Sequence, residues 1–148
     1  MSKSVWEPET RRELKQRLAS VTAQTKPLWG KMSAPQMVTH LADSLRMATG
    51  DLPCAPKSGP LKFFPLKQLV VYWAPWPKGA PTAPELLARA PVAWTSEMSD
   101  ATAMIDRVAE RGPNGPFADH PAFGTLSGRA WGVLIYRHFD HHLRQFGA

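Results

Sequence analysis

Three histidines occupy positions that could bring their side chains together inside a helical protein. His138 and His142 are four residues apart in a segment with helical periodicity, so their side chains project from one face. That face also carries Trp131 and Leu134, so both imidazoles should point into the interior. His40 lies on the apolar face of an earlier helical segment. Burying three imidazoles without partners is unfavourable, and a divalent cation bound by all three removes that cost.

A three-histidine set leaves at least one coordination position open, which is typical of catalytic rather than structural metal sites. Water bound there would have a lowered pKa and could act as a nucleophile, or the ion could activate a thiolate. Imidazole ligands suit Zn, Ni, Cu or Fe. The alternative is that His138 and His142 form a surface pair, and that His40 is an ordinary core histidine.

Three polar residues are spaced to orient the rings of these histidines. Gln36 and Asp43 lie four residues before and three after His40, and Gln145 lies three after His142. Each could contact the second ring nitrogen of a metal-bound histidine and so orient the ring. Each could equally be a solvated residue on the flank of its helix.

Two further histidines have less defined roles. His141 points about 100° away from His142, so we interpret it as a flanking group rather than a ligand. His120 precedes a proline in a loop, where a local backbone hydrogen bond or a place at the pocket mouth are the two interpretations. Asp43 or His141 could serve as a general base.

Four segments with helical periodicity should position these residues. The second begins with a capping box at Ser33–Gln36 and ends at Gly50. We expect an all-α four-helix bundle. The four segments are residues 8–22, 33–50, 95–111 and 127–146.

A long proline-rich crossover separates the second and third helices. Nine of the 15 prolines fall between Pro53 and Pro91, so regular structure should be short over residues 50–92. A short helix over residues 61–73, interrupted at Pro65, is one expectation. The run Leu69–Trp73 could instead be a strand, although it has no evident partner.

The composition is that of one globular domain spanning residues 1–148. Hydrophobic residues make up 43% and charged residues 20%, which excludes a disordered chain. The single cysteine, Cys54, excludes an internal disulfide and Cys-rich zinc sites. The start lacks the apolar core of a signal peptide, and no run approaches the roughly 18 apolar residues of a membrane span. We therefore expect a cytoplasmic protein with no membrane partner.

The formal net charge of +6 is spread along the chain, and most basic residues have an acidic neighbour. A nucleic-acid-binding protein usually concentrates its positive charge on one element. We therefore expect no nucleic-acid partner. A homodimer is compatible with the sequence, because soluble oligomers favour twofold symmetry.

Both ends of the chain resemble DinB/YfiT-like proteins. Residues 138–145 read HFDHHLRQ and resemble the HxxHH-x-x-Q signature of that superfamily. Residues 29–41, WGKMSAPQMVTHL, are similar to its first ligand segment, in which a helix carries Gln-x-x-x-His. Residues 120–124, HPAFG, are similar to one subgroup of unknown function. Residues 50–92 match little of the superfamily.

The resemblance implies a four-helix bundle that holds a divalent metal, nickel or zinc, on His40, His138 and His142. The superfamily includes transferases that use mycothiol or bacillithiol and an isomerase with a thiol cofactor. We therefore expect a metal-dependent hydrolase or thiol-dependent transferase, whose partners are a small-molecule substrate and a low-molecular-weight thiol. The alternative is a non-catalytic binding or stress-response module in which the ion only ties two helices together.

Overall fold

The computed structural model describes residues 2–148, which are helical without a named strand. They form five α-helices: α1 (Pro8–Ser20), α2 (Ala34–Thr49), α3 (Leu66–Tyr72), α4 (Trp94–Arg111) and α5 (Gly128–Gln145). Two short 3-10 helices, η1 (Pro60–Lys62) and η2 (Pro84–Leu86), lie in the crossover. The all-helical prediction is confirmed. A four-helix bundle is not confirmed, because the structure has five α-helices; the fifth, α3, lies within residues 61–73, where a short helix was one expectation.

The helix that carries His40 has well-defined ends. The Ser33 hydroxyl accepts from the Gln36 N–H, and the Gln36 side chain accepts from the Ser33 N–H, as the capping box predicts. Gly50 ends α2 in the left-handed conformation, with φ of 87°, which costs glycine nothing. On α5, the Ser127 hydroxyl accepts from the Ala130 N–H and sets the start of the helix.

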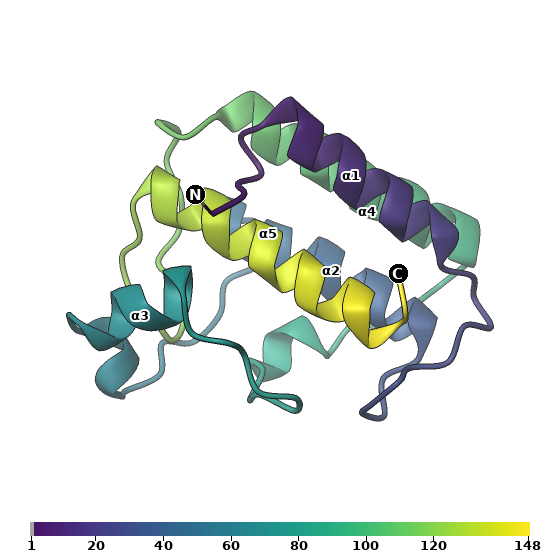
Figure 1. Cartoon of the computed structure of the whole chain (residues 1–148), viewed down its shortest axis with the longest axis horizontal. Helices are drawn as coiled ribbons and strands as arrows, with labels where there is room; N and C mark the ends of the chain where they lie inside the picture. The colour runs from purple at the N-terminus through teal and green to yellow at the C-terminus, as the bar shows by residue number, and fades with distance from the viewer. Residues whose placement is uncertain (1) are drawn as a thin grey trace.

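The four longer helices pack around one apolar core (Figure 1). The most extensive contact is between α2 and α4; α1 packs on α5 and α4, and α5 also contacts α2. Leu14 and Leu18 of α1 and Met37, Leu41 and Leu45 of α2 are buried in this core. The two histidine-bearing helices, α2 and α5, are therefore in direct contact through the core.

The crossover contains helix where a strand was one of the two expectations. Residues 69–72 belong to α3, which packs on α5 and η1, so the strand interpretation is wrong. A strand there would have had no partner for its backbone hydrogen bonds. The interruption at Pro65 is confirmed, because η1 ends at Lys62 and α3 begins at Leu66. Figure 1 shows α3 and the rest of the crossover beneath α5.

Within residues 2–148, no helix combines the length and apolar character needed to cross a bilayer.

Candidate metal centre

His40 from α2 and His138 and His142 from α5 converge on one point. One ring nitrogen from each lies within 4.8 Å of the other two. His40 Nε2 and His138 Nε2 are 2.9 Å apart. His40 is 1% exposed and His142 8% exposed, whereas His138 is half-buried. The three residues selected from sequence therefore meet, and His138 is the least buried of them.

The crossover holds the ring of His40. Its Nδ1 lies 3.1 Å from the carbonyl oxygen of Leu86 in η2. A carbonyl only accepts, so Nδ1 must carry the proton and donate it. The lone pair of neutral His40 is then on Nε2, which faces the other two histidines. Residues 50–92 thus contribute directly to the histidine cluster, through a backbone atom.

The side chain of Gln145 holds the ring of His142 in the same way. Its Oε1 lies 2.7 Å from His142 Nδ1, and its Nε2 donates to the Trp29 carbonyl at 3.0 Å. Because the Gln145 Nε2 group donates to the Trp29 carbonyl, the Gln145 Oε1 atom is the one that faces His142. His142 therefore donates from Nδ1 and presents the lone pair of Nε2. Gln145 has the orienting role that was one of its two predicted interpretations.

The next residue in the Trp29 loop leaves room for this contact. Gly30 adopts φ of +80°, and a Cβ there would lie 2.9 Å from Gln145 Nε2. A side chain at this position would therefore be strained in its own backbone and would press on Gln145. The loop before α2 therefore contacts the end of α5 through Gln145, the residue that also contacts His142.

The donor set suits a transition-metal ion. Two of the three rings already carry their proton on Nδ1, so their Nε2 lone pairs are available. Tetrahedral coordination at ordinary Zn–N distances puts ligand nitrogens about 3.3 Å apart, so the 2.9 Å contact needs only a small opening. No fourth His, Cys, Asp or Glu within residues 2–148 joins the cluster. The described residues therefore offer three nitrogen ligands and no fourth protein ligand.

All three rings are held in the neutral form that binds metals. Burial lowers the pKa of His142 to about 3, and His40 adds to this effect. Burial also lowers the pKa of His138 well below its usual range, again with repulsion from the neighbouring histidines. The pKa of His40 is lowered by burial despite its bond to Leu86. Imidazole binds a metal only when deprotonated, so ligation at neutral pH carries no proton cost.

Aromatic side chains line the edge of the cluster. The ring of His141 lies edge-on to Trp29, with centroids 5.8 Å apart, and 6.0 Å from Trp76. Trp76 also lies 6.1 Å from His138. Burial lowers the pKa of His141, so it is neutral at pH 7. His141 flanks the cluster, as predicted, without belonging to it.

Two of the residues predicted to orient His40 lie in other interactions. The Gln36 side chain is exposed and occupied by the capping box at Ser33. The Asp43 carboxylate is buried and accepts from Arg46 at 2.7 Å and from Arg89 Nε at 3.1 Å. The ring nitrogen of His40 contacts the Leu86 carbonyl instead of Gln36 or Asp43, for which orienting this ring was one of two interpretations.

His120 makes the local backbone contacts that were one of its two interpretations. Its Nδ1 accepts from the N–H groups of Ala122 and Phe123, at 3.0 and 3.2 Å. Burial, together with the charge of Lys57, lowers its pKa to about 4. The ring closes the turn ahead of α5.

A buried charged cluster fixes the crossover against α2 and α4. Arg89 pairs with Asp43 and with Glu97, whose side chains are both 4% exposed. Burial alone would raise the pKa of Glu97, but hydrogen bonds from Arg89 and the Val92 N–H lower it. Arg89 is three residues after Leu86, so this cluster also fixes the carbonyl that holds His40. The sequence does not predict these ion pairs, because an arginine in a loop and a glutamate on a helix are common and do not indicate a partner.

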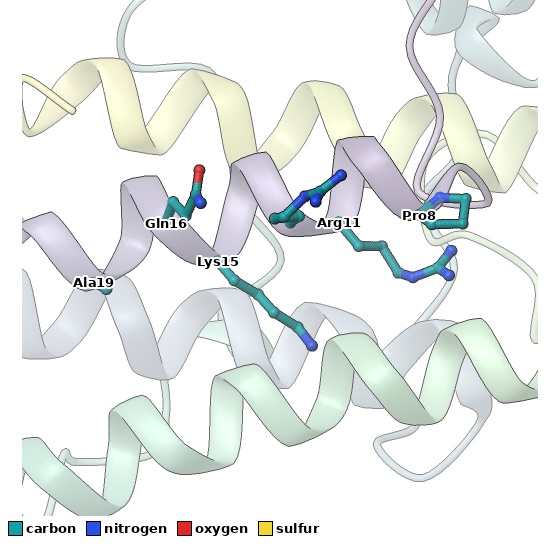
Figure 2. A pocket seen from close by; sticks show the side chains of 6 residues that line it. Pro8, Arg11, Lys15, Gln16 and Ala19 are labelled. Atoms are coloured by element: carbon teal, nitrogen blue, oxygen red, sulfur yellow. The ribbon is translucent and has the colours of Figure 1, made fainter.

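Two surface hollows lie away from the histidines. One, lined by residues of α1 including Pro8, Arg11 and Lys15, is shown in Figure 2. Its cations are already engaged: Lys15 pairs with Asp106 of α4, and Arg11 donates to the carbonyls of Val5 and Trp6. The other lies beside Asp43 and Arg89, between α2 and η2.

Residues 9–148 match a family described as a protein of unknown function, DUF1569. The match spans nearly the whole chain, so the chain belongs to this family. No curated protein and no solved structure matches the chain. The family is uncharacterised, and the match does not establish the DinB/YfiT relationship expected from the motifs.

Proposed function

We propose that this protein is a metal-dependent enzyme whose divalent ion is held by His40, His138 and His142. The observation that carries the proposal is the convergence of three neutral imidazoles, two of them fixed through Nδ1 by carbonyl oxygens. Ligand histidines usually donate their second N–H to such an acceptor, which fixes the tautomer and the ring orientation. Buried histidines that served only as packing would not need three nitrogens to face one another.

Three protein ligands leave at least one coordination position open for a water or a thiol. An ion with an open position lowers the pKa of a water or thiol bound to it and thereby supplies a nucleophile near neutral pH. The resemblance of the two histidine segments to DinB/YfiT-like proteins supports nickel or zinc in a DinB-like four-helix bundle. It also supports a hydrolase or a thiol-dependent transferase as the reaction class.

The surrounding residues restrict water and move protons. Trp29 and Trp76 cover the edge of the cluster and reduce access by bulk water. His141 is neutral at pH 7 and lies against both tryptophans, so it is the candidate for accepting a proton from a bound substrate. Asp43, the other predicted base, is held by two arginines and is assigned no proton transfer.

Metal analysis tests the site. Purified wild-type protein is expected to hold about one Ni²⁺ or Zn²⁺ per chain after loading and dialysis, and His138→Ala and His142→Ala to lose it. His141→Ala is the matched control, because it removes a neighbouring imidazole outside the cluster, and should retain the ion. Unchanged stoichiometry in His138→Ala would remove the proposed site.

Cobalt substitution then tests whether the ion has an open position. Addition of a low-molecular-weight thiol to the Co²⁺-loaded protein should change the visible absorption, because a new ligand alters the coordination geometry. A spectrum that stays the same with every thiol and anion tested would indicate a closed site. That result would favour the non-catalytic module, in which the ion only ties α2 to α5.

A further inference from the structure

The short helix α3 and the residues at its two ends expose large apolar side chains. Phe63, Phe64 and Trp73 are 68%, 81% and 69% exposed, and Leu66 and Leu69 are 36% and 48% exposed. We call these five residues the α3 patch. Leu66 and Leu69 are three residues apart on one face of α3, and Phe63, Phe64 and Trp73 flank its two ends. Contiguous exposed apolar side chains of this size mark an interaction surface.

The patch is held rigidly from its other side. Val71, on the opposite face of α3, is 1% exposed and belongs to the core. Arg137 of α5 donates to the carbonyls of Val70 and Val71 at the end of α3, at 2.7 and 2.9 Å. Binding through the patch would therefore cost little ordering of this segment.

The segment that carries the patch contains cations and no carboxylate. Residues 52–84 contain four lysines, Lys57, Lys62, Lys67 and Lys78, and no aspartate or glutamate. Within the part of the chain that the structure describes, none of these lysines forms an ion pair with a carboxylate. The exposed Arg129 adds a further cation next to α3, where it lies over the Tyr72 ring.

This combination selects one kind of occupant. Two copies of the chain that met symmetrically through the patch would each bring lysines, among them Lys62 and Lys67, and no carboxylate from this segment, so like charges oppose that dimer. An anionic bilayer takes up aromatic and leucine side chains at its interface and attracts the lysines around them. The long lysine stems can lie along the apolar surface while their ammonium groups reach the headgroups.

We propose that the α3 patch is a docking site for the surface of an anionic lipid bilayer. The protein lies on the membrane without spanning it, so the absence of a spanning helix within residues 2–148 is no obstacle. The sequence alone predicts no membrane partner, because its apolar runs are too short to cross a bilayer. It does not reveal that these apolar residues stay exposed in the folded protein.

Co-sedimentation with vesicles tests this proposal. The wild-type protein is expected to sediment with phosphatidylcholine vesicles that contain phosphatidylglycerol, to remain in solution with pure phosphatidylcholine, and to be released as salt is raised. The double variant Phe64→Ser/Trp73→Ser should weaken binding roughly tenfold or more, because two large apolar groups no longer enter the interface. Both positions are exposed, so the fold, checked by circular dichroism, should be unchanged.

The matched control is Leu28→Ser/Val92→Ser, which removes two side chains that are 71% and 85% exposed but lie outside the patch. Its binding should stay within about twofold of the wild type. His138→Ala should bind the anionic vesicles as the wild type does. The test of the docking site is therefore independent of the test of the metal site.

Three results would overturn the proposal: no binding to anionic vesicles, equal binding to neutral vesicles, or an equal loss in the Leu28/Val92 control. A dimer in analytical ultracentrifugation that dissociates in Phe64→Ser/Trp73→Ser would assign the patch to a second copy of the chain instead.

Discussion

The role of Gln145 gives the most discriminating test of the metal centre. Gln145→Ala removes the acceptor of the His142 Nδ1–H and the donor to the Trp29 carbonyl, while the backbone bond from Leu28 N–H to the Gln145 carbonyl remains. His142 is 8% exposed, so its N–H would be left with little access to water. The ring would then be free to rotate or to adopt the other tautomer, which points a proton at the metal position.

The expected cost follows from these contacts. Loss of an acceptor behind a ligand histidine typically weakens metal binding 10- to 100-fold, or about 1.4–2.7 kcal/mol. The unpaired buried N–H should also lower the free energy of unfolding of the metal-free protein by about 1–3 kcal/mol.

A second variant, Gln145→Glu, separates the effect on metal affinity from the effect on stability. It keeps an acceptor for His142, so metal affinity should stay within about tenfold of the wild type. It also places carboxylate oxygens against the Trp29 carbonyl, so stability should fall.

The assay is a competition titration with a chromophoric chelator, with Zn²⁺ or Ni²⁺, alongside urea unfolding of the apoprotein. Gln36→Ala is the control, because sequence spacing gives Gln36 and Gln145 the same expected role. The structure places Gln36 on the Ser33 cap, so its loss should cost about 1 kcal/mol of stability and leave metal affinity unchanged. An unchanged dissociation constant in Gln145→Ala, or an equal loss in Gln36→Ala, would refute the assignment of the His142 tautomer.

Three other variants test the framework around the site. Gly30→Ala should lower both the free energy of unfolding and the metal affinity, because the new Cβ presses on Gln145. The control is Gly79→Ala, where φ is a similar +76° but the space is open, so it should cost only the backbone strain of about 1 kcal/mol. Equal metal affinities in these two variants would contradict the contact between position 30 and Gln145. Arg89→Met should lower the urea-unfolding free energy by about 1–3 kcal/mol, because buried Asp43 and Glu97 each lose a partner, while the exposed Arg107→Met control should change it by less than about 0.5 kcal/mol. The pKa of His120 is about 4 in the folded protein and about 6.5 when unfolded, so the unfolded state binds more protons between these values and the stabilisation is lost as pH falls through this range. His120→Asn keeps a local hydrogen-bond acceptor that does not titrate. Between pH 7 and pH 5 the wild type should therefore lose about 2 kcal/mol more free energy of unfolding than the variant does. An equal loss in both proteins would show that His120 is not held neutral.

The amino-acid sequence by itself determined the long helices and the histidine face. Apolar residues at helical spacing, the Ser33–Gln36 capping box and Gly50 specify α2 locally, and these features survive in any tertiary context. The same periodicity puts His138 and His142 on the inward face of α5 and His40 on that of α2. Because both faces had to be buried, their convergence could be predicted.

Only the tertiary structure decided which atoms complete the site. The acceptor for His40 is a backbone carbonyl of η2, and every residue has such a carbonyl, so no residue type signals it. Gln36, Asp43 and Gln145 have similar spacing to a histidine, yet only Gln145 reaches a ring, because the other two are engaged by the Ser33 cap and by arginines. The crossover is likewise positioned by Arg89 contacts 46 and eight residues away in sequence. Local spacing specifies which side of a helix a residue occupies, whereas its partners depend on how distant segments pack.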